Sequence, residues 1–355
     1  MSEEKILTKE IIIQEIPKFD DAVDLSQYTQ IDDDAAESLS KCKHLNAERW
    51  GNCGAELSLD GLTQLSDAAA ESLSKNEGNL LLDSLTELSD AAAESLSKCQ
   101  GDLFLNGLTE LSDAAAKSLS KHEGDLLLDS LTELSDAAAE SLSKFKGKVL
   151  GLDGLTELSD AAAESLSKFK GKVLGLDGLT ELSDVGAESL SKLKGEYLYL
   201  RLNGLTELSD AAAESLSAIK GELSLESLTE LSDAAAESLS ARKGNLLLSS
   251  LTELSDAAAE SLSKFKGEVL DLDGLTELSD VGAESLSAIK GELLLCSLTE
   301  LSDAAAESLS KFKGEMLALT GLTELSDAAA KSLAEMNAMT RELSEAAVEQ
   351  ISAYR

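Results

Sequence analysis

A 24-residue segment, LTELSDAAAESLSKFKGKVLGLDG, occurs twice in succession, over residues 131–154 and 155–178. Related segments recur along most of the 355-residue chain at spacings of 23 or 24 residues, with one spacing of 26. A unit this short cannot bury its own apolar face, so the copies must stack as the coils of a solenoid. The copies begin at Leu62, Leu85, Leu108, Leu131, Leu155, Leu179, Leu205, Leu228, Leu251, Leu275, Leu298 and Leu322, and a degenerate copy begins at Tyr28.

Each copy has one half with the periodicity of a strand and one half with the periodicity of a helix. In GDLFLNGL (101–108), Leu103 and Leu105 point to one face, and Phe104 and Asn106 point to the other. In the copy at residue 131, apolar residues recur at helical spacing. They are Leu134, Ala138, Leu142 and Phe145. The sequence therefore predicts one strand and one short helix in each coil.

The predicted helix has recognisable ends. Ser135 is a favourable N-cap, and Asp136 places a negative charge on the first turn. Lys144 and Lys146 lie near the C-terminal end, and Gly147 is expected to stop the helix. Compensation of the helix dipole explains this sorting of charge without any ligand.

The LxLxxL run followed by a helix, and the wording LTxLSDxAAExLSK, resemble the short repeats of bacterial leucine-rich repeat proteins. The resemblance covers about residues 22–335. It implies a right-handed α/β solenoid of about 13 coils, with a parallel β-sheet on the concave side and short α-helices on the convex side. Glycine or serine stands where the family usually has asparagine after the strand. The family consists mostly of binding surfaces, which implies a binding role.

Open solenoids need capped ends, so the chain is expected to have three parts. Residues 1–61 would form an N-terminal cap with the first degenerate repeat, and residues 62–335 the repeat array. Residues 336–355 would form a C-terminal capping helix. Its predicted apolar face, at spacings of four residues, is Leu343, Ala347 and Ile351.

The chain is strongly acidic, with 67 acidic residues against 30 basic ones and a formal charge of −37. Such a charge repels phosphate backbones and anionic lipid headgroups, which argues against nucleic-acid and membrane partners. A protein partner with a basic surface fits the charge. The 43 % hydrophobic content, periodically arranged, argues for a folded chain rather than a disordered one.

No apolar run approaches the roughly 18 residues of a membrane span, and the N-terminus lacks a signal-peptide profile. A cytoplasmic protein is therefore expected. Cys42, Cys53, Cys99 and Cys296 fall at unrelated positions without metal-ligand spacing, so neither a metal nor a cofactor is predicted. A Cys42–Cys53 bridge would require the N-terminal cap to bring the two together.

The residue inventory argues against an enzyme. The two histidines are His44, in an irregular stretch, and His122, in a slot that other copies fill with Phe or Ile. A histidine in such a slot is typically a structural core residue. The serines follow from repeated helix caps without a nearby His–Asp partner, and the glycines are single and periodic rather than grouped in a phosphate loop.

Two residues before the start of most copies the chain carries a polar residue that points away from the core, often an aspartate. Asp129, Asp153 and Asp177 occupy three successive coils, about 5 Å apart in an in-register stack. Like charges at this spacing are unfavourable unless something offsets them. Either water screens a surface kept acidic for solubility, or the ladder attracts a basic protein or loosely binds divalent cations.

Four residues before the start of three successive copies the outward residue is apolar. These residues are Leu81, Phe104 and Leu127. Contiguous apolar surface on a soluble protein often marks an interface. The alternative is that the protein's own N-terminal segment covers it.

The 26-residue copy departs most from the pattern. In GEYLYLRLNG, Tyr197, Tyr199, Arg201 and Asn203 are expected to share the outward face of an unusually long strand. Tyrosine and arginine are enriched at the energetic centres of protein interfaces. The alternative is an insertion whose tyrosines only lie over the neighbouring strand.

The sequence thus favours a non-enzymatic scaffold that binds a protein through its concave face. The predicted interface is centred on Tyr197, Tyr199 and Arg201 and assisted by the acidic ladder. One alternative is a structural repeat protein that self-associates or is bridged by cations. Another is a repeat-only bacterial effector. The oligomeric state is left open.

Overall fold

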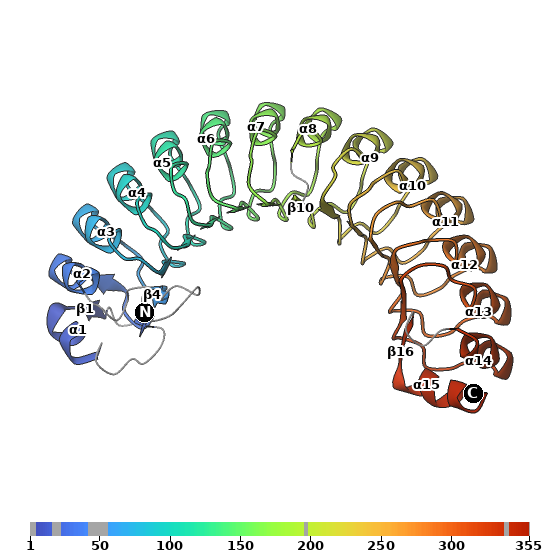
Figure 1. Ribbon diagram of the computed structural model, residues 1–355. Coiled ribbons are helices and arrows are strands. Elements are labelled where there is room, and N and C mark those ends of the chain that lie inside the picture. Colours follow the sequence, from blue (N-terminus) through green and yellow to red (C-terminus); the bar gives the residue numbers. More distant parts are fainter. Residues whose placement is uncertain (1–4, 16–22, 42–55, 195–197, 337–340, 355) are drawn as a thin grey trace. The chain divides into compact units, whose positions relative to one another are not determined.

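The computed structural model describes residues 5–15, 23–41, 56–194, 198–336 and 341–354. The chain divides into two units, Met1–Gly178 and Leu179–Arg355. In both units strands and helices alternate, as the repeat predicts. Within each unit the strands lie along the inner, concave side of the curve and the helices along the outer side (Figure 1).

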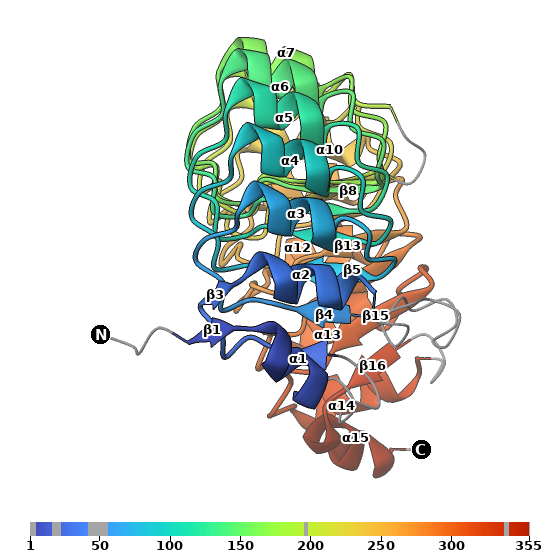
Figure 2. The ribbon, with the colours of Figure 1, turned by 90° about the vertical axis from the view of Figure 1, so that its left-hand side faces the viewer.

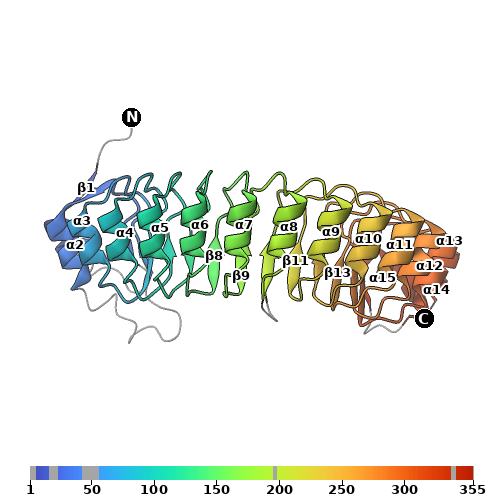
Figure 3. The same ribbon diagram turned by 90° about the horizontal axis from the view of Figure 1, so that it is seen from above.

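In the first unit the described helices stack in chain order, as Figures 2 and 3 show for α3 to α7. The helices are α1 (Lys9–Glu15), α2 (Asp33–Ser40), α3 (Asp67–Leu73), α4 (Asp90–Leu96), α5 (Asp113–Leu119), α6 (Asp136–Leu142) and α7 (Asp160–Leu166). The strands are β1 (Ile6–Leu7), β2 (Val23–Asp24), β3 (Gln30–Ile31), β4 (Glu56–Ser58), β5 (Asn79–Leu81), β6 (Leu103–Phe104), β7 (Leu126–Leu127), β8 (Val149–Gly151) and β9 (Val173–Gly175).

The second unit continues the alternation up to the C-terminus. Its helices are α8 (Asp184–Leu190), α9 (Asp210–Leu216), α10 (Asp233–Ser240), α11 (Asp256–Leu262), α12 (Asp280–Leu286), α13 (Asp303–Leu309), α14 (Asp327–Ala334) and α15 (Glu345–Ser352). Its strands are β10 (Tyr199–Arg201), β11 (Glu222–Ser224), β12 (Leu246–Leu247), β13 (Val269–Asp271), β14 (Glu292–Leu294), β15 (Met316–Leu319) and β16 (Arg341–Leu343).

Strands from successive coils pair in parallel, and equivalent residues of the repeat face each other. Leu103 of β6 pairs with Leu126 of β7, and Val149 of β8 pairs with Val173 of β9. In the second unit Leu223 of β11 pairs with Leu246 of β12 in the same way. The α/β leucine-rich solenoid predicted from the repeat is therefore confirmed.

The core is built from the same positions in every coil. In the coil of α6, the strand-side leucines Leu126, Leu128 and Leu131 are fully buried. Ala139 and Leu142 of the helix are fully buried as well. Each fully buried leucine contributes about 1.5–3 kcal/mol relative to an exposed one, so the stacking of coils supplies the main stabilisation.

A second set of contacts joins the helix starts of neighbouring coils. The hydroxyl of Ser135 caps α6 by accepting a hydrogen bond from the backbone N–H of Ala138, at 3.0 Å. The same hydroxyl donates to Asp113 Oδ1 of the preceding helix, at 2.5 Å. Ser159 donates in turn to Asp136, at 2.5 Å. The aspartate at each helix start therefore accepts a bond from the next coil, in addition to its favourable place on the helix dipole.

This Ser–Asp series closes differently at each end. At the start of α2 the N-cap is Asp32, which accepts from the backbone N–H of Ala35 at 2.6 Å and has no hydroxyl to donate. At the other end, Ser344 caps α15 and donates to the backbone carbonyl of Leu322 instead of to an aspartate. The last aspartate of the series, Asp327, hydrogen-bonds with the hydroxyl of Tyr354.

The chain ends add elements that the repeat pattern does not contain. Near the N-terminus, β1 pairs with β3 in a separate two-stranded parallel sheet. On α1, Ile12 is buried and Ile13 is exposed. The region of Cys42 and Cys53 lies outside the described residues.

The predicted apolar face of the C-terminal helix is partly wrong. Leu343 belongs to β16 and pairs with Leu319 of β15, and the helix begins only at Glu345. The chain stays extended through the N-cap Ser344, because β16 completes one more strand of the sheet before the turn into the helix. Ala347 and Ile351 are buried, as expected.

One column of core side chains lies just after the C-terminal ends of the helices. His122, Phe145 and Phe169 occupy it in three successive coils, with ring centroids 6.4 and 6.3 Å apart. His122 is fully buried, and among the described residues neither ring nitrogen has a hydrogen-bond partner. Burial lowers the pKa of His122, while the backbone and charges of neighbouring groups, including Ser97, Asp102 and Asp125, act in the opposite direction. His122 is therefore a neutral core residue.

Replacing Ser135 by Ala should destabilise the stack, because it removes both the cap on Ala138 N and the bond to Asp113. Loss of a serine cap typically costs about 0.5–2 kcal/mol. We expect a lower midpoint of urea unfolding followed by circular dichroism. Ser143→Ala is the matched control, since within the described ranges that hydroxyl donates to Glu140 O of its own helix and to no other coil. An equal drop for both variants would show that the contact between coils adds nothing.

The buried His122 should make stability depend on pH. Its pKa in the fold lies below the unfolded value of about 6.5, so the unfolded chain binds more protons in between. The contribution of His122 to the free energy of unfolding is therefore fully present above the unfolded pKa. It declines as the pH falls below that pKa, by at most about 1.4 kcal/mol per pH unit. Urea midpoints of the protein and of His122→Phe, measured from pH 7.5 to about 5, should diverge on the acidic side. Parallel curves would contradict this role.

Candidate functional site

Alternate residues of each strand point away from the core. In β5 and the residues after it, Leu80 and Leu82 are fully buried, whereas Asn79, Leu81 and Asp83 are half-buried. We call the surface formed by these outward-pointing residues the strand face; it lies on the concave side of each unit. The candidate binding residues described below all belong to it.

The acidic ladder is a hydrogen-bonded structure. The backbone N–H of Asp153 donates to Asp129 Oδ1 at 3.4 Å, and that of Asp177 donates to Asp153 Oδ1 at 3.1 Å. The series begins earlier, since the N–H of Asp83 donates to Asp60 Oδ1 at 3.2 Å. These bonds offset the repulsion expected between successive carboxylates, and they hold the charges at a fixed spacing on the strand face.

Two carboxylates of the strand face are markedly desolvated: Asp83 of the ladder, and Asp271, which lies four residues before the start of its copy. Burial raises the pKa of Asp83, and the neighbouring Asp60 raises it further, while bonds from Asn106 oppose the change. Burial also raises the pKa of Asp271, against bonds from Asp273 and Ser249. The raised pKa values indicate that these two carboxylates, when ionised, are poorly solvated and would gain from a nearby positive charge.

The predicted apolar residues are brought together. Leu81 pairs with Phe104, and Phe104 pairs with Leu127, so the three side chains lie on adjacent strands. All three are half-buried. The row ends at Ser58 on one side and Gly151 on the other. We call Leu81, Phe104 and Leu127 the apolar stripe.

The residues predicted in the 26-residue copy lie at the start of the second unit. Tyr197 is outside the described residues. Tyr199, Arg201 and Asn203 are half-buried on the strand face. The expected long strand is wrong: β10 covers three residues, like β11, and Tyr199 pairs with Glu222 in ordinary register.

A hydrogen-bond network holds this patch. Ser224 is fully buried, and its hydroxyl lies 2.6 Å from Asn203 Oδ1 and 2.9 Å from Glu226 Oε1. Burial raises the pKa of the Tyr199 phenol; Glu222 and Glu226 add to this, while a bond with Ser224 and the charge of Arg201 oppose it. A patch fixed in this way loses little side-chain entropy when a partner binds.

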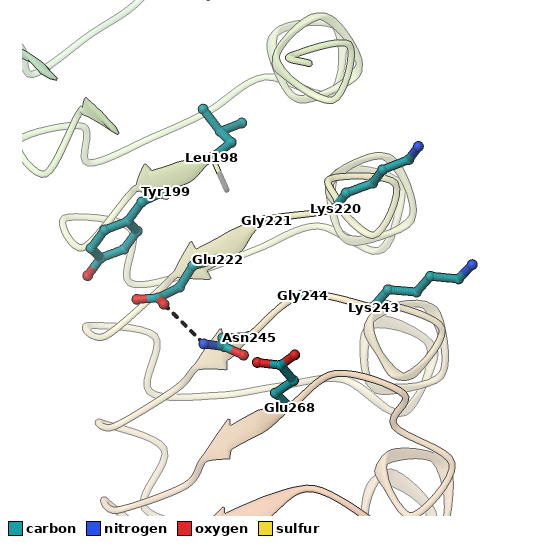
Figure 4. A pocket seen from close by; sticks show the side chains of 9 residues that line it. All are labelled: Leu198, Tyr199, Lys220, Gly221, Glu222, Lys243, Gly244, Asn245 and Glu268. Atoms are coloured by element: carbon teal, nitrogen blue, oxygen red, sulfur yellow. Dashed lines mark hydrogen bonds between the residues drawn. The ribbon is translucent and has the colours of Figure 1, made fainter. Parts of the chain in front are cut away.

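A pocket of about 250 Å³ adjoins the patch, at the strand starts (Figure 4). Asn245 links the strands on either side of it, β11 and β13. Its Nδ2 donates to Glu222 Oε2 at 3.1 Å, and its Oδ1 accepts from the backbone N–H of Val269 at 3.2 Å. In Figure 4 the ammonium groups of Lys220 and Lys243 point away from the carboxylates of Glu222 and Glu268. The lining residues are Leu198, Tyr199, Lys220, Gly221, Glu222, Lys243, Gly244, Asn245 and Glu268.

Sequence reasoning missed Arg242, which lies beneath this pocket wall. Its side chain is 1 % exposed and donates to the carbonyls of Leu216 at 2.9 Å, Gly221 at 2.8 Å and Asn245 at 3.1 Å. Burial lowers its pKa to about 10. The sequence did carry one signal of its burial: Arg242 occupies the position in its copy that Phe145 and Phe169 occupy in theirs.

The described residues offer little for metal or thiol chemistry. Within the described ranges no three His, Cys, Asp or Glu side chains are grouped as metal ligands. Cys99 and Cys296 are free thiols, and burial raises the pKa of Cys99 to about 12. No helix in the same ranges has the length and apolar character needed to cross a membrane.

Neither a protein-family model nor a curated protein matches the sequence. Among solved structures, the chain is similar to one in the mouse RP105/MD-1 complex, with a TM-score of 0.56 and 17 % identity over 81 % of this chain and 53 % of that chain. It is similar to one in the Drosophila Toll–Spatzle complex, with a TM-score of 0.51 and 15 % identity over 79 % and 38 %. An internalin of Listeria monocytogenes aligns with a TM-score of 0.45 and 15 % identity over 81 % and 83 %.

The chain thus spans about half of the matched chain in the RP105 complex and less than half of the matched chain in the Toll complex. Similarities at identities this low establish a shared fold and nothing further. RP105 and Toll are leucine-rich repeat proteins, and the repeat, the strand–helix alternation and the leucine core of this chain agree with that fold. The chain thus has the fold of a leucine-rich repeat solenoid.

Proposed function

We propose that this protein is a non-enzymatic scaffold that holds a partner protein with a basic surface on its concave strand face. In this proposal residues 1–61 and 336–355 cap the array of residues 62–335. The observation that carries it is the network around Tyr199, Arg201 and Ser224, next to a surface rich in fixed carboxylates. We assign Tyr197 to the same interface as part of this proposal.

The side chains in this patch suit recognition better than catalysis. Tyr199 and Arg201 offer large contact area with polar groups, which is the composition of interface hot spots. Glu222 and Glu226 lie beside them and would pair with a basic partner. The RP105/MD-1 and Toll–Spatzle structures are of protein complexes, which supports a protein as the partner here.

The acidic ladder of Asp129, Asp153 and Asp177, on the strand face of the first unit, assists binding by attracting a basic partner at a distance. Carboxylates in a row steer a basic surface toward the face and raise the association rate. Salt weakens such steering, because the Debye length falls from about 30 Å at 0.01 M to about 8 Å at 0.15 M. Affinity for the natural partner should therefore decrease as the salt concentration rises.

The double variant Tyr199→Ala, Arg201→Ala should lose most partner capture from an extract of the native cell at low salt. A loss of at least about tenfold is expected, since hot-spot truncation commonly exceeds 1.4 kcal/mol. Helicity and melting should not change. Glu307→Ala with Lys311→Ala is the control, since this exposed ion pair at the C-terminal end of α13 lies away from the strand face and its removal leaves the net charge unchanged. Full capture by the folded double variant would refute the proposed interface.

Size-exclusion chromatography with and without calcium separates this proposal from a cation-bridged assembly. A scaffold whose carboxylates already accept backbone N–H groups should elute at the same volume in both conditions. Calcium needs six to eight oxygen ligands, which a row of single carboxylates on one chain supplies poorly. Calcium-dependent oligomers would favour the structural alternative instead.

A further inference from the structure

The apolar stripe lies between two polar rows on the strand face of the first unit. One row runs two residues after the stripe positions, at Asp83, Asn106 and Asp129. The other runs two residues before them, at Asn79, Asp102 and Asp125. Because alternate strand residues share a face, both rows flank Leu81, Phe104 and Leu127 on the same surface.

Both polar rows are held in place by bonds from the next coil. On one side the N–H of Asp102 donates to Asn79 Oδ1 at 2.9 Å, and that of Asp125 donates to Asp102 Oδ1 at 2.8 Å. On the other side the N–H of Asn106 donates to Asp83 Oδ1 at 3.1 Å. The stripe is therefore an apolar track with a fixed acidic margin on each side.

The spacing of the stripe matches a helix laid across the strands. Neighbouring strands are about 4.8 Å apart, and an α-helix advances about 5.4 Å per turn. A helix placed along the stripe would set one apolar side chain per turn on each of the three residues. The mismatch is about 0.6 Å per strand, small enough for side chains to absorb over three turns.

We propose that the apolar stripe seats an amphipathic basic helix of a partner protein. Its apolar residues, at i, i+4 and i+7, would contact Leu81, Phe104 and Leu127. Lysine or arginine on both sides of that apolar line would meet the two acidic margins. This inference rests on the proposed function, that the strand face binds a basic protein, and it assigns a second contact and its chemistry.

The second unit supplies a natural comparison. The same strand position there carries Leu247, Asp271 and Leu294 on three adjacent strands. A carboxylate interrupts the apolar row, so a helix could place no continuous apolar line on it. Serine is tolerated at this position, since Ser58 and Ser224 occupy it in other coils. Changes to serine in the apolar stripe and at Leu247 and Leu294 therefore occur at equivalent positions of the repeat and can be compared directly.

The test uses the full chain and a synthetic 14-residue helical peptide with three leucines at i, i+4 and i+7 and lysines on both flanks. We expect one-to-one binding by calorimetry that is weaker at high salt. Phe104→Ser with Leu127→Ser should weaken it at least about tenfold, while Leu247→Ser with Leu294→Ser should leave it unchanged. A peptide with glutamate in place of lysine should not bind.

Several outcomes would overturn the proposal. Equal binding of a scrambled peptide of the same composition would indicate plain charge attraction, and equal binding to the Phe104/Leu127 variant would remove the stripe from the interface. Faster hydrogen exchange in residues 1–55 of that variant would assign the stripe to the chain's own N-terminal segment. Dimerisation of the protein that the variant abolishes would assign it to a second copy.

The two proposals fail separately. Tyr199→Ala with Arg201→Ala should keep full peptide binding, because these residues lie outside the stripe. If the peptide does not bind while partner capture still depends on Tyr199 and Arg201, the helix seat is refuted and the scaffold function stands. If the peptide binds as expected and capture is indifferent to Tyr199 and Arg201, the interface centred on those residues is refuted.

Discussion

The fold depends on side chains of one coil completing the hydrogen bonding of the next. At the strand ends, Asp129 accepts the backbone N–H of Asp153. At the helix starts, Ser135 caps its own helix and donates to Asp113 of the coil before it. Leucine burial supplies most of the stabilising free energy, but it is non-directional. The polar bonds are directional, and they set the register in which the leucines meet.

This dependence explains how so acidic a chain can stack its charges. A row of carboxylates a strand apart is unfavourable by itself, yet here Asp129 and Asp153 each accept a backbone N–H from the next coil. The acidity is thus partly a structural requirement. It also leaves a strand face whose negative charge is fixed in space, and the proposed partner contacts draw on that property.

The repeat period and the alternation of Leu103 and Phe104 were enough to predict the solenoid, its core leucines and the apolar stripe, since these follow from local periodicity. The place of Leu343 in a strand was mispredicted, because pairing with a neighbouring strand overrides helical spacing. The length of β10 was mispredicted, because the alternation of Tyr199 and Arg201 does not reveal which residues pair with β11. The Ser–Asp bonds and the carbonyl partners of Arg242 could not be predicted, because they join residues whose proximity only the stacked coils create.

The ends of the Ser–Asp series differ in chemistry from its interior. Asp32 starts it without a hydroxyl, and the Tyr354 hydroxyl satisfies Asp327 at the other end. Asp32 stands in the degenerate first copy and Tyr354 lies beyond the last copy, so a coil can be duplicated or deleted in the interior without altering either end of the series. The identical segments 131–154 and 155–178 are what such an event leaves behind. The array is thus free to change its length in evolution by whole coils.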